Sequence, residues 1–195
     1  MLLIMPAFSS RKELTHDRIL DVAARAIRRA GYDGVGLASI LKEAGLTHGG
    51  FYAHFASRNA LLADATQRAG RDTGAILVER LRQAQAQGMS PFSALVHTYL
   101  ADAQLENAEC SCVVAALASE IPRQAEEVVS AARARVLGLV DLVRRTLPAH
   151  VDPAQAQVVT ATLVGTLQLA RTLQGKTGKA WLGNVRASLI QQYDA

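Results

Sequence analysis

The chain has 195 residues, of which 50% are hydrophobic and 5% aromatic, and its formal net charge is +4. This length fits one large domain or a small domain followed by a medium one, with ample apolar material for a core. No run reaches the ~20 apolar residues of a membrane span, and the short apolar start lacks the basic segment of a signal peptide. We therefore expect a soluble cytoplasmic protein.

The positive charge is concentrated in the first third of the chain. Residues 1–60 hold eight Lys/Arg against five Asp/Glu, a net charge of +3, whereas residues 61–195 hold thirteen against twelve. Such an excess is a mild indication of a polyanionic partner, although an ordinary solvated surface explains it as well. Cys110 and Cys112 are too few and too close together for a disulfide framework, so we expect reduced thiols.

The first elements expected along the chain are two helices that end in glycine-containing turns. Thr15 can cap the first helix, whose apolar residues recur at helical spacing up to residue 30. The second helix is short, and Gly45 ends it at a position suited to a left-handed backbone. Only two residues separate Gly45 from the next segment, which is typical of a helix-turn-helix.

The stretch GLTHGGFYAHF, residues 45–55, is predicted to contain a third helix over about residues 47–54. Phe51 and Phe55 are four residues apart and share a face, which we expect to pack on the first two helices. The opposite face is flat where Gly49 and Gly50 carry no side chains. A helix that enters the DNA major groove with its N-terminal end near the bases needs such a surface.

The polar residues of this outward face divide by role. Tyr52 and His54 can donate to phosphate, Arg58 is a natural phosphate ligand, and Thr47 and His48 can reach bases or phosphate. The predicted DNA-binding residues are Ser39, Thr47, His48, Gly49, Gly50, Tyr52, Ala53, His54 and Arg58.

Three other interpretations of the same stretch are less favoured. His48 and His54 are six residues apart, so on a helix they face different ways, and no nearby cysteine or acid completes a tetrahedral metal site. A phosphate-binding glycine turn would need a preceding strand and a following lysine. Tyr52 could belong to the core, but its spacing relative to Phe51 and Phe55 argues against that.

The rest of the chain is predicted to be helical. Ser57 is a suitable cap for a long alanine- and leucine-rich helix that runs to about residue 87. Further helices are expected over about 92–109, 113–120, from Pro122 to 147, 153–173 and 180–193, with QGKTGK as a loop. The pattern predicts an all-α fold: a helix-turn-helix DNA-binding domain over residues 11–58 and a larger helical regulatory and dimerisation domain over 59–195.

A family resemblance rests on the stretch RILDVAARAIRRAGYDGVGLASILKEAGLTHGGFYAHFASRNALL. It resembles the DNA-binding domain of the TetR/AcrR family of bacterial transcriptional regulators. The resemblance implies a ligand-binding second domain, a two-fold dimer and a near-palindromic operator. The chain departs from the family at Gly36, where many members carry a capping Ser or Thr, at Ala38, where many carry a basic or polar residue, and at the Gly49–Gly50 pair.

The two cysteines allow several interpretations. They can be small buried residues at a helix start, or a thiol sensor, because a helix N-terminus stabilises a thiolate. Glu106 and Glu109 lie close in sequence and oppose the second interpretation. A metal sensor that combines the cysteines with His97 or His150 also remains open.

Both a ligand pocket and a dimer interface are expected in the second domain. Apolar pockets between helices are the default site for a small molecule, and core packing accounts for the same residues equally well. Ala161, Gly165 and Ala170, with a stripe of Trp181, Val185 and Leu189, suggest an interface in the last two helices. The ligand or sensor candidates are Phe92, Leu95, Tyr99, Cys110, Cys112, Leu117, Leu137, Val140, Leu163 and Leu167.

These patterns predict a transcriptional regulator of the repressor type, released from double-stranded DNA by a small molecule or by thiol modification. An enzyme or small-molecule carrier on the same fold is the alternative. No Ser-His-Asp set, glycine-rich cofactor loop or paired carboxylate stands out in the sequence, so we expect no catalytic residues, no cofactor and no resident metal.

Overall fold

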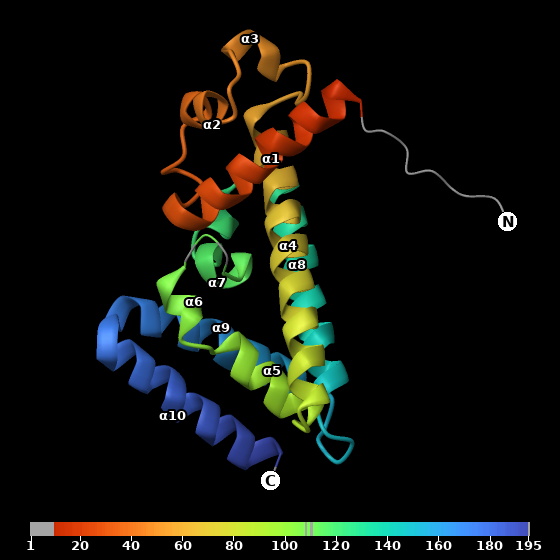
Figure 1. The fold of residues 1–195 in the computed structure, drawn as a ribbon, viewed down its shortest axis with the longest axis vertical. Helices are drawn as coiled ribbons and strands as arrows, with labels where there is room; N and C mark the ends of the chain where they lie inside the picture. The colour runs from red at the N-terminus through yellow and green to blue at the C-terminus, as the bar shows by residue number, and fades with distance from the viewer. Residues whose placement is uncertain (1–9, 108, 110, 195) are drawn as a thin grey trace, which may run out of the picture.

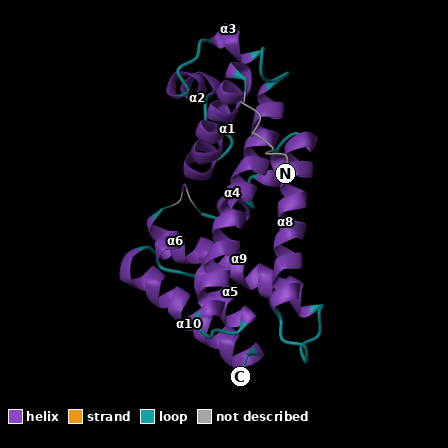
Figure 2. Cartoon of the chain, turned by 45° about the vertical axis from the view of Figure 1, so that its right-hand side comes forward, coloured by secondary structure: helices purple, strands orange, loops and turns teal. Residues whose placement is uncertain are grey.

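The computed structural model describes residues 10–107, 109 and 111–194, and these residues form helices and loops without a strand (Figure 2). The predicted all-α fold is confirmed. None of the described helices is both long and apolar enough to cross a membrane. In chain order the elements are α1 (Arg11–Ala30), α2 (Leu37–Glu43), α3 (His48–Phe51), α4 (Arg58–Ala86), α5 (Pro91–Tyr99), α6 (Ala103–Glu106), α7 (Val113–Leu117), the 3-10 turn η2 (Ile121–Arg123), α8 (Glu126–Thr146), α9 (Gln155–Leu173) and α10 (Gly175–Tyr193).

The molecule is elongated, with α2 and α3 at one end and α10 at the other (Figure 1). α4 runs along most of its length beside α8. Ser57 caps α4 as predicted, since its hydroxyl accepts a hydrogen bond from the amide of Ala60 at 3.0 Å. The same helix contributes Leu61 and Leu62 to the core at the α2–α3 end and Leu81 to the core at the other end. One continuous helix therefore joins the two hydrophobic cores.

α1 begins four residues before the predicted start at Thr15. Ser10 forms a capping box: its hydroxyl accepts from the amide of Glu13 at 3.2 Å, and the Glu13 carboxylate accepts from the amide of Ser10 at 2.6 Å. Because this reciprocal pair satisfies two amides at once, the helix starts there. Thr15 lies inside the helix, where its hydroxyl donates to the carbonyl of Arg11.

Other helix boundaries also differ from the predictions. The third helix, expected over about 47–54, ends at Phe51, and the helix expected over 113–120 ends at Leu117. The helix expected over 92–109 ends at Tyr99, and the separate short helix α6 follows. QGKTGK was expected to be a loop, but α10 begins at Gly175. The reason lies at the buried Gly178, where a Cβ atom would come within 2.4 Å of the carbonyl oxygen of Ala170. Glycine thus allows the first turn of α10 to lie directly against α9.

Residues distant in sequence hold the loop after α1 in place. Gly31 has a φ of 77°, and the amide of Tyr32 donates to the carboxylate of Glu120 at 2.8 Å. Tyr32 is fully buried, and its hydroxyl shares a 2.8 Å hydrogen bond with that of Thr66 on α4. Burial is the main cause that raises the pKa of Tyr32 above 10.0, so the phenol stays neutral.

The anchoring of this loop leads to a prediction about Gly31. A Cβ atom there would meet the Glu120 carboxylate at 2.4 Å. We expect Gly31→Ala to lower the free energy of unfolding by about 1–3 kcal/mol, because a backbone with φ 77° and ψ 174° strongly favours glycine, and by a further ~1 kcal/mol for the displaced carboxylate. Gly45→Ala is the matched control, because Gly45 has a φ of 69° but open space around it. Equal losses in the two variants, measured by urea unfolding, would contradict the role of Glu120.

Candidate nucleic-acid interface

The turn between α2 and α3 is closed by hydrogen bonds across Gly45. The amide of Gly45 donates to the carbonyl of Lys42 at 3.1 Å, and that of Leu46 donates to the carbonyl of Leu41 at 2.8 Å. Together with the φ of 69° at Gly45, this is a Schellman motif, which satisfies the last carbonyls of α2. The predicted left-handed position of Gly45 is confirmed, and it sets the angle at which α3 leaves α2.

α3 and the turn that follows it to Phe55 have an aromatic inner side and a polar outer side. Phe51 and Phe55 are 1% and 4% exposed, and their rings stack with centroids 5.7 Å apart. The inward direction predicted for this pair is confirmed. The exposed residues of the opposite side are Thr47, His48, Gly49, Tyr52 and Ala53.

The outer side is open where the sequence predicts clearance for DNA. Tyr52 is 66% exposed, and nothing lies within 4 Å of a Cβ atom built on Gly49. Gly50 is different, because a Cβ atom there would meet the Leu46 side chain at 3.3 Å. Of the two glycines, only Gly49 therefore keeps the outer surface flat, while Gly50 allows close packing inside the turn. On α2, Ser39 is exposed, and Gly36 at the N-cap offers no side-chain hydrogen bond.

His54 lies at the edge of this surface rather than on it. Its ring centroid is 6.1 Å from that of His16 on α1, and its Nδ1 atom is buried without a hydrogen-bond partner. Desolvation, followed by the charges of His16 and Lys12, lowers the pKa of His54 below 6.5. The lowered pKa favours the neutral imidazole, so a hydrogen bond from His54 to phosphate, which stays a prediction, would lack a positive charge.

Arg58 has a structural role that the sequence did not reveal. Its Nη2 atom donates to the carbonyl of Tyr32 at 2.6 Å and to that of Val35 at 3.2 Å. These carbonyls belong to the loop between α1 and α2, far from Arg58 in sequence, so no local pattern indicated the contact. The guanidinium is thus engaged inside the domain, and its role as a phosphate ligand stays a prediction.

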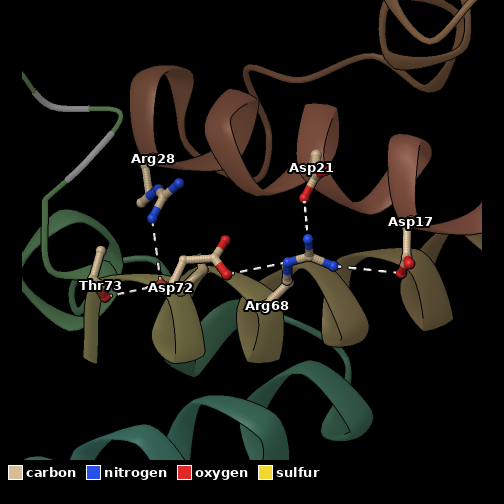
Figure 3. A network of polar contacts seen from close by, with 7 residues as sticks. Asp17, Asp21, Arg28, Arg68, Asp72 and Thr73 are labelled. Atoms are coloured by element: carbon tan, nitrogen blue, oxygen red, sulfur yellow. Dashed lines mark hydrogen bonds and ion pairs between the residues drawn. The ribbon is translucent and has the colours of Figure 1, made fainter. Parts of the chain in front are cut away.

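The helix-turn-helix is fastened to α4 by a polar network (Figure 3). The guanidinium of Arg68 reaches Asp21 at 2.6 Å, Asp72 at 3.1 Å and Asp17 at 3.4 Å. Asp17 and Asp21 lie on α1, whereas Asp72 lies on α4 itself. Arg28 of α1 donates to the carbonyl of Ala69 at 3.3 Å beside this network. Because Arg68 is only partly exposed, these contacts are less screened than those of an ordinary surface pair.

A cavity of about 510 Å³ lies between α4, α5, α6, α7 and α8. Of the candidates named from the sequence, Tyr99 and Cys112 line it. Cys110 lies outside the described residues. Phe92, Leu117, Leu163 and Leu167 are core residues away from the cavity wall, and Leu137 is 62% exposed on α8.

The sequence missed the α4 and α8 side of the cavity. The residues between Gly70 and Arg80 supply much of its wall, together with Arg135 and Gly138 of α8. The available signal was a pair of glycines, Gly70 and Gly74, inside a helix where alanine would be favoured by ~1 kcal/mol. Among the described residues, no three His, Cys, Asp or Glu side chains cluster as potential metal ligands.

The geometry defines the class of domain. Two short helices joined by a tight glycine turn, with an exposed polar side on the second, form a helix-turn-helix of the DNA-binding type. Residues 19–65 match the family model described as bacterial regulatory proteins, tetR family. The helix-turn-helix domain matches this family model, which confirms the resemblance predicted from the sequence.

Solved structures share the fold over nearly the whole chain. E. coli NemR in its reduced form is 21% identical with a TM-score of 0.76, and 92% of this chain and 96% of NemR are covered. A TetR-family transcriptional regulator from Agrobacterium tumefaciens is 23% identical, with a TM-score of 0.74 and coverage of 95% and 100%. One from Cytophaga hutchinsonii is 16% identical, with a TM-score of 0.77 and coverage of 94% and 95%. No curated protein sequence matches the chain.

The contacts of Arg58 lead to a stability prediction. Because Arg58 donates to two loop carbonyls, we expect Arg58→Ala to lower the free energy of unfolding by about 1–3 kcal/mol. Asn59→Ala, at the exposed neighbouring position, is the control and should change it little. Thermal unfolding monitored by circular dichroism measures both. A variant with weakened DNA binding and an unchanged unfolding midpoint would restore the phosphate role instead.

Proposed function

We propose that the protein is a DNA-binding transcriptional regulator whose α3 enters the major groove and whose activity is controlled by a small molecule. The observation that carries this proposal is the exposed polar side of α3 within a domain that matches the tetR family. A regulator of this kind acts in the cytoplasm, where bacterial DNA lies. Repression is the expected output.

Within this proposal the exposed residues of α3 divide by distance from the bases. Thr47 and His48, at its start, are the candidates for base contacts, and an imidazole N–H can donate to the O6 or N7 atom of guanine. Tyr52, one turn later, is placed for phosphate. Gly49 and Ala53 have little or no side chain, so they allow α3 to lie close enough to the DNA for both contacts. Ser39 on α2 is a further phosphate candidate.

Variants of Tyr52 and His48 test this division. We expect Tyr52→Phe to weaken binding to operator and random duplex alike, by about 3- to 10-fold, since one hydroxyl donor is lost. His48→Ala should instead reduce discrimination between the two duplexes by about tenfold. Fluorescence anisotropy with DNA from the protein's own upstream region, over a range of salt concentrations, measures both. Full affinity in Tyr52→Phe, or unchanged discrimination in His48→Ala, would refute the assigned role.

A two-fold dimer formed through α9 and α10 is part of the proposal. Val158, Leu169 and Leu173 are exposed on α9, and a Cβ atom built on Gly165 would meet nothing within 4 Å. These four positions share one side of the helix. Trp181 is also exposed, at the start of α10. Two residues that the sequence suggested for the interface are buried within this chain: Leu189 of the apolar stripe and Ala170 of the small residues. The proposed interface therefore does not include them.

The dimer can be tested by placing a charge on α9. Leu169→Glu should raise the dimer dissociation constant by at least about 100-fold, since a carboxylate would be buried in an apolar contact. Leu137→Glu is the matched control, because Leu137 is equally exposed but lies on α8. Size-exclusion chromatography with light scattering measures the mass. Retention of a dimer by Leu169→Glu would contradict the assigned interface.

A thiol signal is the second candidate for control. Cys112 is half-buried and lines the cavity next to Tyr99, where modification would add bulk to the wall. The similar fold of a protein solved in its reduced form is compatible with this. A Cys112→Ser variant that keeps its response to oxidants in a DNA-binding assay would exclude Cys112 as the sensor.

A further inference from the structure

The cavity between α4, α5, α6, α7 and α8 carries charge of one sign only. Among the described residues no Asp or Glu side chain lines it, and apart from the charged residues the wall consists of apolar, glycine and neutral polar residues. The charged residues of the wall are Arg80, Arg135 and Arg145. Such a wall favours negative charge in a largely apolar space.

The three arginines differ in how their charge is balanced. Arg145 donates to the carboxylate of Asp141 at 3.0 Å, and Arg80 is exposed to solvent. Arg135 is half-buried, its Nε atom is buried without a hydrogen-bond partner, and the described residues supply no ion pair to its guanidinium. A partly buried cation without a partner is costly in free energy. An anion bound beside Arg135 would offset this cost.

Gly70 explains how Arg135 reaches this position. A Cβ atom built on Gly70 would lie 2.1 Å from Cδ and 2.9 Å from Cγ of Arg135. The side chain of Arg135 therefore crosses from α8 directly over the backbone of α4. A larger residue at position 70 would displace the side chain of Arg135, so Gly70 leaves the space in which the guanidinium reaches the cavity wall.

Tyr99 supplies a second polar group on the same wall. It is 2% exposed, and its buried hydroxyl has the Cys112 thiol and the Arg171 guanidinium as polar neighbours. Burial is the largest cause that raises the pKa of Tyr99 well above 10.0. The phenol is therefore protonated and can donate a hydrogen bond.

We propose that this cavity binds an apolar molecule that carries a single carboxylate or a comparable anionic group, with Arg135 as the counter-charge. A guanidinium presents two parallel donors that match a carboxylate, which gives the pair both energy and orientation. The apolar body of the ligand would lie along residues such as Leu77 and Leu139. Such a molecule would be the effector of the proposed function. Its binding to the cavity does not depend on that function, but its role in regulation does.

Calorimetric titration of the full chain without DNA tests the charge preference. Two probe series differ only in the head group: decanoate, 1-decanol and decylammonium, and 2-naphthoate with 2-naphthol. In at least one series we expect the carboxylate to bind about tenfold or more tightly than the alcohol, as for a hydrogen bond to a charged group, with decylammonium weakest. Equal or weaker binding of the acid in both series would overturn the proposal, and so would the absence of acid binding.

Variants of Arg135 test whether this residue causes the preference for the carboxylate. Arg135→Gln should lose the tenfold advantage of the acid while binding of the alcohol is kept, and Arg135→Lys should retain part of it. Arg133→Gln is the matched control on the same helix, since Arg133 is exposed and outside the cavity. An acid preference that survives in Arg135→Gln would overturn the assignment.

Gel shifts of the same preparations keep the two proposals apart. Acid binding with no binding to the upstream DNA would contradict the proposed function alone. DNA binding without an acid preference would contradict this inference alone.

Discussion

The contact on which the rest of the structure depends is the packing of α1 against α4. Arg68 gathers two carboxylates from α1 and one from α4 around a single guanidinium (Figure 3). Buried apolar residues such as Ile19 and Leu61 lie in the same core. α2 and α3 have little other support, because they are short and stand at the end of the molecule (Figure 1). Their direction in space is therefore set by how α1 sits on α4.

The loop between α1 and α2 makes this attachment rigid. Tyr32 enters the core, its amide is bound by Glu120, and Arg58 holds its carbonyl. α4 then continues from this junction into the cavity wall, where Gly70 lies beneath Arg135. On the proposed function, a ligand in the cavity and DNA at α3 therefore act on one helix. The ligand can shift α4 only by the difference between its affinities for the two arrangements.

The parts of the fold that local signals control were predictable from the sequence. Helix periodicity gave the all-α class, Gly45 marked the turn, and the spacing of Phe51 and Phe55 identified the inner side of α3. The start of α10 and the role of Arg58 were not predictable, because Gly178 and Arg58 act on Ala170, Tyr32 and Val35 across the fold. The cavity wall was missed for the same reason, since residues of five helices meet there.

The structure also changes what the charge of the first third means. A net excess of cations in residues 1–60 favours a polyanionic partner only if those cations are available to it. Several are already engaged: Arg25 pairs with Glu43, Arg29 pairs with Glu109, and Arg28 and Arg58 donate to backbone carbonyls.

Four other cations of this region are exposed and have no ion pair among the described residues: Arg11, Lys12, Arg18 and Lys42. They lie on the first half of α1 and on α2. Because long-range attraction to phosphate depends on such solvated charges, α1 and α2 supply most of the attraction of the proposed interface. α3, whose outer side carries no Lys or Arg, is left in the proposed interface to distinguish one base sequence from another.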